Sequence, residues 1–99
     1  MSIKFRGREY KVNTWREILC KTPEEIYKEK KDLTFALKIK GRKRIYFSKN
    51  SRDLVDPQKI KGTPYFCEGN LNANYIVKIV KTLLNIFDYS PQDLEIICR

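Results

Sequence analysis

The amino-acid sequence predicts a single α+β domain with a mainly antiparallel sheet and two main helices on one face, and three observations lead to this class. The chain has 99 residues, which suffices for one hydrophobic core but not for two. Hydrophobic residues make up 41% of the chain, enough to form that core. Short segments of alternating apolar and polar residues are interspersed with segments of helical periodicity, an order typical of helices packed on an antiparallel sheet. We therefore expect residues 1–99 to form one domain.

The N-terminal residues predict a β-hairpin over residues 3–12, followed by a helix. Gly7 lies between the two alternating halves of the hairpin and can adopt the positive φ angle of a tight turn. The spacing of Thr14 and Glu17 is that of a capping box, which predicts the helix start. A second start signal comes at Thr22-Pro23, so we expect the helix to be broken or kinked there and to resume afterwards.

The next segment predicts two strands joined by a turn. Alternating apolar residues favour a strand over residues 34–40, and continuation of the preceding helix is the alternative. Gly41 marks the turn, and residues 44–48 form the returning strand.

The C-terminal half predicts a loop, a short strand, the longest amphipathic helix and a final strand. Residues 49–63 are rich in turn-forming side chains, and residues 64–68 follow as a strand. A 3-4-3 spacing of apolar residues predicts a helix over residues 73–88, with Asn72 as its N-cap. Residues 94–98 form the last strand, central or half-buried in the sheet.

Composition excludes several functional classes. No stretch approaches the ~20 apolar residues that cross a bilayer, and the N-terminus lacks the apolar region of a signal peptide, so we expect a cytoplasmic protein that contacts no membrane. The three cysteines are far apart and the chain has no histidine, which leaves neither a zinc site nor a disulfide framework. We expect reduced, buried cysteines, no metal and no other cofactor.

Catalysis also finds little support in the residues. Without histidine there is no Ser–His or Cys–His pair, and the four glycines never take the spacing of a phosphate-binding loop. A metal-dependent nuclease is the remaining enzyme class, because Glu9 and Lys11 form a Glu-x-Lys pair. No carboxylate precedes Glu9 in the chain to complete its metal site. We therefore expect a protein that is not an enzyme and has no catalytic residues.

Positive charge is concentrated in the first two thirds of the chain. Residues 1–62 hold 18 basic and 8 acidic side chains, a net charge of +10, whereas residues 63–99 hold 3 and 4, a net charge of −1. Residues 38–52 contain seven basic side chains and no acidic one. Such clustering attracts polyanions, and a surface that only confers solubility is the alternative.

A nucleic-acid-binding face is therefore predicted around residues 38–52, with the arginines of the N-terminal turn as an extension. Tyr46 alternates with apolar neighbours, so that its ring either stacks on an exposed base or lies partly buried with a solvated hydroxyl. The candidate nucleic-acid-binding residues are Lys38, Lys40, Arg42, Lys43, Arg44, Tyr46, Lys49, Arg52, Arg6 and Arg8.

Several stretches resemble a small accessory domain of restriction-type and nuclease-associated proteins of bacteria, archaea and phages. They are Trp15-Arg16-Glu17-Ile18-Leu19, the segments 41–48 and 61–63, and the run from Asn70-Leu71-Asn72-Ala73-Asn74 to Leu94-Glu95-Ile96. The resemblance implies a setting in mobile elements, phages and host defence. It implies no catalytic or binding residues.

Two functions follow from these features. The first is a small non-enzymatic module that binds DNA or RNA in a phage or host-defence, restriction-related setting. The second is a phage-encoded inhibitor, such as an anti-CRISPR or anti-restriction protein, that binds a host nucleoprotein complex and would expose an apolar patch around Tyr65 and Phe66. A basic structural protein of a virus is a third reading, and a homodimer is left open.

Overall fold

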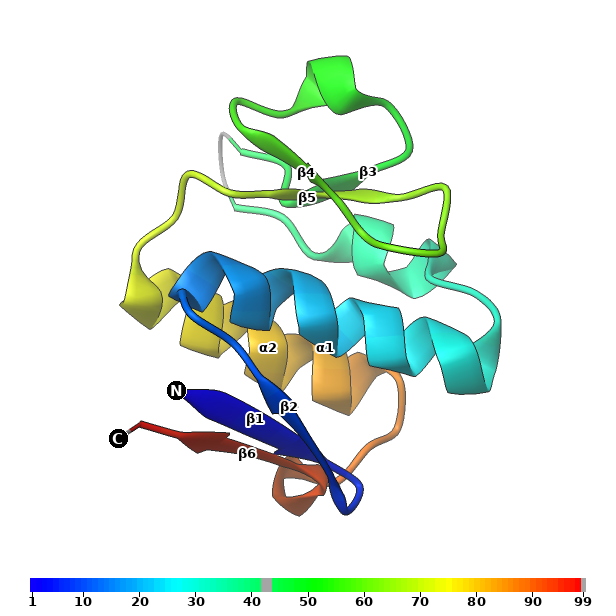
Figure 1. Cartoon of the computed structure of the whole chain (residues 1–99). Helices are drawn as coiled ribbons and strands as arrows, with labels where there is room; N and C mark the ends of the chain where they lie inside the picture. The colour runs from blue at the N-terminus through cyan, green and yellow to red at the C-terminus, as the bar shows by residue number, and fades with distance from the viewer. Residues whose placement is uncertain (42–43, 99) are drawn as a thin grey trace.

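The computed structural model describes residues 1–41 and 44–98 and contains two helices between two small antiparallel sheets (Figure 1). One sheet has the strand order β2-β1-β6 and the other β3-β5-β4. The α+β class, the antiparallel strands and the two main helices are confirmed, although the strands form two sheets where the sequence predicted one. The elements are β1 (Ser2–Phe5), β2 (Arg8–Lys11), α1 (Trp15–Lys30), the 3-10 helix η1 (Thr34–Lys38), β3 (Phe47–Ser48), the 3-10 helix η2 (Ser51–Asp53), β4 (Pro57–Lys59), β5 (Phe66–Glu68), α2 (Ala73–Ile86), the 3-10 helix η3 (Pro91–Asp93) and β6 (Leu94–Ile97).

The first sheet contains the predicted N-terminal hairpin. Arg6 and Gly7 form its turn with φ angles of 50° and 87°, which confirms the role expected of the glycine. Ile3 and Phe5 of β1 are buried against the helices. Strand β6 pairs antiparallel with β1 alone, so it is a half-buried edge strand, and the two chain ends lie side by side (Figure 1).

Helix α1 is continuous, so the predicted break near Thr22 is wrong. Pro23 lacks the amide hydrogen that would bond the preceding turn. In the same turn, the Thr22 hydroxyl donates a hydrogen bond to the carbonyl oxygen of Ile18 at 2.9 Å. Thr22 and Pro23 are both buried, and this tertiary packing keeps the helix together across the proline.

The start of α1 follows the predicted cap. The Thr14 side-chain oxygen accepts a hydrogen bond from the Glu17 amide at 3.2 Å. The Glu17 carboxylate reaches back and accepts one from the amide of Asn13, one residue before the cap. Two amides at the helix start are thereby satisfied.

Residues 34–40 contain the 3-10 helix η1 and not the predicted strand. Leu33, Ala36 and Ile39 are buried, and their spacing of three is the repeat of a 3-10 helix. Phe35, which the strand prediction placed on an apolar face, is 48% exposed. In so short a segment, the apolar residues fit both the alternation of a strand and the three-residue repeat of a 3-10 helix. Packing of Leu33, Ala36 and Ile39 in the core favours the 3-10 helix.

The second sheet is built from very short strands around β5. Of the predicted strand over residues 44–48, only its last two residues form β3, preceded by an isolated bridge between Lys40 and Ile45. Strand β4 lies in the segment 49–63 that was predicted to be a loop. Strand β5 occupies the second half of the predicted strand 64–68 and pairs with both neighbours.

Helix α2 confirms the clearest sequence prediction. The Asn72 side chain caps it by accepting a hydrogen bond from the Tyr75 amide at 3.0 Å. The helix packs against α1 (Figure 1). The apolar stripe is buried and consists of Ile76, Ile79, Val80, Leu83 and Leu84.

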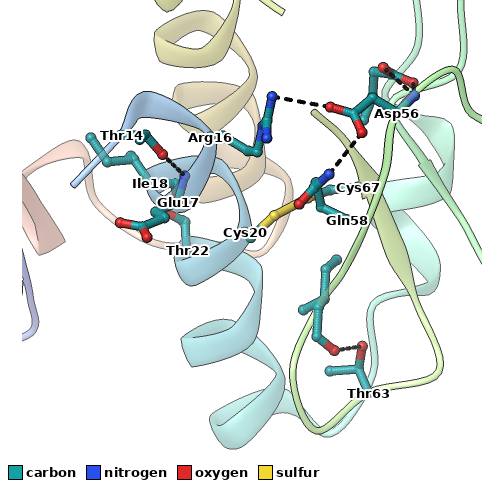
Figure 2. Close-up of a disulfide and its surroundings, with 12 residues drawn as sticks. Thr14, Arg16, Glu17, Ile18, Cys20, Thr22, Asp56, Gln58, Thr63 and Cys67 are labelled. Carbon is teal, nitrogen blue, oxygen red and sulfur yellow. Dashed lines mark hydrogen bonds and ion pairs between the residues drawn. A yellow bond between two sulfur atoms is a disulfide. The ribbon is translucent and has the colours of Figure 1, made fainter. Parts of the chain in front are cut away.

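A disulfide joins Cys20 of α1 to Cys67 of β5 (Figure 2). The prediction of three reduced, buried cysteines is therefore wrong, and Cys98 is free but exposed. The Cα atoms of the bonded pair are 6.3 Å apart, within the usual disulfide range, while 47 residues separate the two in sequence. An ion pair between Arg16 and Asp56 at 3.2 Å spans the same junction between helix and sheet (Figure 2).

Across residues 1–41 and 44–98, no helix combines the length and the apolar composition that crossing a bilayer requires.

Candidate nucleic-acid interface

Lys40 and Gly41 pair with Ile45 and Arg44 within the stretch predicted to bind nucleic acid, and we call these four residues the basic turn. The amide of Gly41 donates to the carbonyl oxygen of Arg44 at 2.9 Å, and the bridge between Lys40 and Ile45 closes the turn behind them. Tyr46 is half-buried beside the turn, and a Cβ added at Gly41 would lie 2.7 Å from its hydroxyl. A side chain at position 41 would therefore displace the tyrosine.

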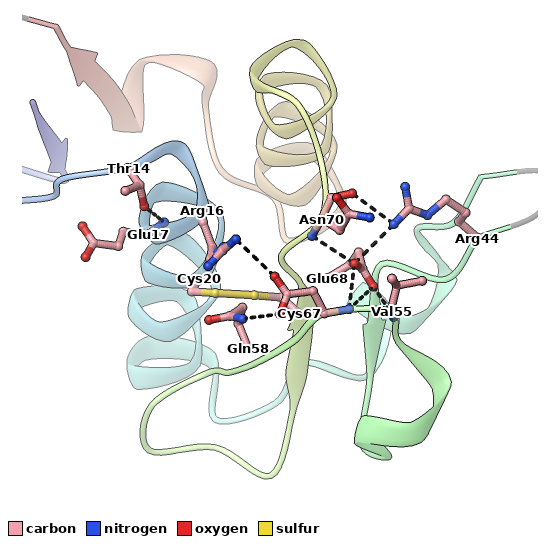
Figure 3. Close-up of polar contacts among 11 residues, drawn as sticks. Thr14, Arg16, Glu17, Cys20, Arg44, Val55, Gln58, Cys67, Glu68 and Asn70 are labelled. Carbon is pink, nitrogen blue, oxygen red and sulfur yellow. Dashed lines mark hydrogen bonds and ion pairs between the residues drawn. A yellow bond between two sulfur atoms is a disulfide. The ribbon is translucent and has the colours of Figure 1, made fainter.

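A buried carboxylate lies next to this turn. Glu68, at the end of β5, is 1% exposed. Its oxygens accept hydrogen bonds from the amides of Val55 at 2.7 Å, Asp56 at 3.1 Å and Asn70 at 3.0 Å (Figure 3). The Arg44 guanidinium lies 3.2 Å from the same carboxylate and balances its charge. A buried charge is tolerated only when it is paired and hydrogen-bonded, and Glu68 meets both conditions.

Arg44 also connects the turn to a second segment. Its guanidinium donates to the backbone carbonyl oxygen of Asn70 at 3.0 Å (Figure 3). Two segments that are 26 residues apart in sequence are thereby held together at one edge of the molecule.

The second segment leads from β5 into α2 and carries three asparagines. Asn70, Asn72 and Asn74 are all exposed, and the Asn72 side chain is used as the helix cap. Gly69 precedes them where the backbone approaches Asp56: an added Cβ would lie 3.0 Å from the Asp56 carbonyl oxygen and 2.7 Å from its carboxylate. A larger residue at position 69 would displace the Asp56 side chain and press on the backbone just before β4. We call Arg44, Glu68 and the segment 69–74 the Arg44–Asn70 site.

Three of the ten sequence-predicted residues lie at this site or beside it. Arg44 belongs to it, and Lys40 and Lys38 are exposed just before the turn. Arg42 and Lys43, which the sequence places between Gly41 and Arg44, lie outside the described residues.

Three further predicted residues flank β3 or lie in η2. Lys49 and Arg52 are exposed near η2, with the Lys49 ammonium 5.3 Å from the ring centroid of Tyr65. Tyr46 supports the turn and is half-buried, as one of the two sequence interpretations had it.

The two remaining predicted residues lie apart from the rest. Arg6 and Arg8 are at the turn of the first sheet, on the far side of the helices from β3-β5-β4 (Figure 1). The Arg6 guanidinium pairs with the Glu29 carboxylate at 2.9 Å. The structure therefore does not join them to one continuous face with residues 38–52.

Sequence reasoning assigned no binding role to Glu68 or to the asparagines. Asn72 was predicted only as a helix cap. The available signal was the alternation of asparagines directly after a strand and before a helix, where their side chains remain exposed.

The fold and this site define a small α+β domain that presents a basic turn and an asparagine-bearing segment side by side. The chain belongs to the family described as the SeqA protein C-terminal domain, whose model matches residues 3–99. Two curated relatives, from Aliivibrio fischeri and Tolumonas auensis, are each named a negative modulator of initiation of replication. Each is 31% identical in an alignment of 81 residues, and the match covers 75% of this chain and 45% and 48% of the respective relatives. The chain thus spans about half the length of the curated relatives it matches. No solved structure matches.

Family membership corrects the resemblance drawn from the sequence. The chain is a SeqA-family domain and not a restriction-type or nuclease-associated accessory domain, so the phage and host-defence setting is wrong. The anti-CRISPR or anti-restriction alternative, with its host nucleoprotein partner, loses its basis as well. The exposed apolar patch around Tyr65 and Phe66 that would have favoured it is not formed by these residues, because Tyr65 is 3% exposed and Phe66 is half-buried.

Proposed function

We propose that this chain is the DNA-binding part of a negative modulator of replication initiation, and that it binds duplex DNA through the Arg44–Asn70 site without catalysing a reaction. The names of the two relatives support the modulating role, and family membership supports DNA as the partner. A protein that acts on the bacterial chromosome works in the cytoplasm, which is where the proposal places it.

The double contact of Arg44 carries the proposal. By pairing with Glu68 and donating to the Asn70 carbonyl oxygen, it holds a basic turn beside exposed amide side chains. Arginine and lysine bind phosphates and guanine edges, while asparagine pairs with the N6 and N7 atoms of adenine in the major groove. The two segments together offer both kinds of contact.

The position of Tyr46 favours a duplex over a single strand. Single-strand binding relies on aromatic rings that stack on bases. Tyr46 is half-buried beside the turn, so its ring does not stand free for a base to stack on. The exposed asparagine side chains of residues 70–74 suit a groove of a double helix better.

The finer proposal concerns the sequence and its methylation. A modulator of initiation has to distinguish newly replicated DNA from DNA that awaits replication. Where adenine in GATC is methylated, a newly replicated duplex carries the methyl group on one strand only. We propose hemimethylated GATC duplex DNA as the preferred target, with asparagine amides at the adenine edge.

Fluorescence anisotropy with labelled duplexes tests this function. The probes are matched duplexes with GATC methylated on neither strand, one strand or both strands, and one duplex without GATC. Asn70→Ala removes the amide but leaves the backbone contacts of residue 70 in place. Asn85→Ala is the control, because Asn85 is an exposed asparagine near the other end of α2.

We expect wild type to prefer the duplex methylated on one strand, and Asn70→Ala to lose about tenfold or more in affinity together with that preference. Asn85→Ala should bind like wild type. Absence of duplex binding even at low salt would refute the proposal, and so would equal effects of the two substitutions.

A further inference from the structure

A basic groove adjoins the Arg44–Asn70 site. It has a volume of about 390 Å³ and lies between the segment after η1 and one face of α2. Its walls include Lys38, Lys40 and Lys78, the rings of Tyr46 and Tyr75, and apolar side chains of α2.

The charge of this groove is of one sign. None of the described residues that line it is acidic, and its three lysines are exposed. Among the described residues, no ion pair involves any of the three. The Lys78 ammonium lies 5.9 Å from the ring centroid of Tyr75. Three ammonium groups, one of them beside a phenol ring, form a surface suited to an anion with an attached apolar portion.

The groove is continuous with the site at two points. Lys40 lines the groove and also pairs with Ile45 in the basic turn, so the wall formed by residues 38–40 leads directly into the turn. Tyr75 donates its amide to the side chain of Asn72, so the other wall begins where the asparagine segment ends. A strand of nucleic acid contacted by the turn and the asparagines therefore has a basic path leading away from both.

We propose that this groove holds the sugar–phosphate backbone of the DNA flanking the bases contacted at the Arg44–Asn70 site, an inference that rests on the proposed function. The lysines contact successive phosphates, and the two tyrosines pack against deoxyribose or donate their hydroxyls to phosphate oxygens. Phosphate contacts of this kind fix register and orientation without reading sequence. The groove thus supplies affinity and alignment, while the asparagines supply preference.

The test compares two triple variants of equal net charge. The groove variant is Lys38→Ala, Lys40→Ala and Lys78→Ala. The control variant is Lys4→Ala, Lys11→Ala and Lys81→Ala, which removes exposed lysines that do not line the groove. Because both lose three charges, a general effect of net charge is the same in each. Duplex binding is measured over a series of salt concentrations.

The groove variant should show a salt dependence shallower by about 0.9 in log Kobs against log salt for each phosphate that it no longer neutralises, so by about 2 to 3 in total. Its preference among GATC duplexes should stay as in wild type, and the control should keep the wild-type slope. Equal slopes for the groove and control variants would overturn the inference. If wild type bound duplex DNA and Asn70→Ala lost its preference, the proposed function would survive that result.

Inorganic phosphate distinguishes a DNA backbone from a free phosphate ligand. Millimolar phosphate should compete with duplex no better than chloride at equal ionic strength. Displacement of duplex from wild type, but not from the groove variant, would show a pocket for free phosphate and overturn the inference. Failure of wild type to bind duplex at all would overturn both it and the proposed function.

Discussion

At the scale of single residues, the Glu68 carboxylate organises the candidate site. Three backbone amides and one guanidinium converge on it, from Val55 and Asp56, from the nearby Asn70 and from Arg44. The sequence could predict the helix caps Thr14 and Asn72, because their partners lie within three residues. It could not predict the role of Glu68, since most of its partners are 12 to 24 residues away.

Glu68→Gln should lower both stability and DNA affinity. The substituted amide group would place an NH2 among N–H donors and would leave Arg44 without its counter-charge. A buried donor without a partner costs about 1–3 kcal/mol of unfolding free energy. Urea denaturation measures this loss, with exposed Glu95→Gln as the control. A variant as stable as wild type would show that the Glu68 network contributes little.

Ionisation of Glu25 should make the stability of the fold depend on pH. Burial raises the pKa of its carboxyl, but hydrogen bonds from Lys28 and Tyr10 and the charges of Lys28 and Lys21 outweigh burial, and the pKa lies below its ordinary value of 4.5. A lowered folded-state pKa means that ionised Glu25 stabilises the fold above pH 4.5. That contribution is lost as pH falls through the folded-state pKa.

Thermal unfolding between pH 7 and pH 3 checks this dependence. We expect the loss of stability on acidification to be smaller in Glu25→Gln than in wild type. Glu95→Gln should follow the wild-type curve. Identical curves for all three proteins would show that groups other than Glu25 cause the loss of stability in acid.

At the scale of elements, long-range packing decides what local patterns leave open. The apolar stripe of α2 spans several turns and was predicted with its cap. The segment 34–40 is too short for its alternation to exclude a 3-10 helix, and burial of Leu33, Ala36 and Ile39 selected the helix. The division of the strands into two sheets depends on pairings far apart in sequence, which periodicity does not encode.

The disulfide between α1 and β5 should stabilise the fold. Closing a loop of 47 residues in the unfolded chain corresponds to about 4 kcal/mol by chain entropy, and 2–4 kcal/mol is typical. Thiol titration of the denatured, unreduced protein should find one free thiol, that of Cys98. The double variant Cys20→Ser, Cys67→Ser should unfold at lower urea concentration. Three titratable thiols would contradict the bond.

At the scale of the whole molecule, the two helices lie between two basic surfaces that the sequence analysis predicted to form one face. The excess positive charge was predicted to form one face from residues 38–52 and the N-terminal turn. The fold puts that turn on one sheet and the basic stretch on the other (Figure 1). Net charge along the chain could be read from sequence, but its distribution over the surface depends on tertiary structure.

Arg6→Ala, Arg8→Ala should therefore keep duplex affinity within about twofold of wild type at physiological salt, because charges beyond a Debye length are largely screened. Anisotropy with the duplex of highest affinity measures this. A loss as large as that of Asn70→Ala would place the N-terminal turn in the interface.

Binding of duplex DNA at the Arg44–Asn70 site can be observed residue by residue in an NMR titration of the 15N-labelled chain with a hemimethylated GATC duplex. We expect the largest amide shift changes on Gly41, Arg44 and residues 68–75. Smaller changes should follow along residues 38–40 and the first two turns of α2. Shift changes centred on the β1–β2 turn or on β6, with the Arg44–Asn70 site unaffected, would contradict the account.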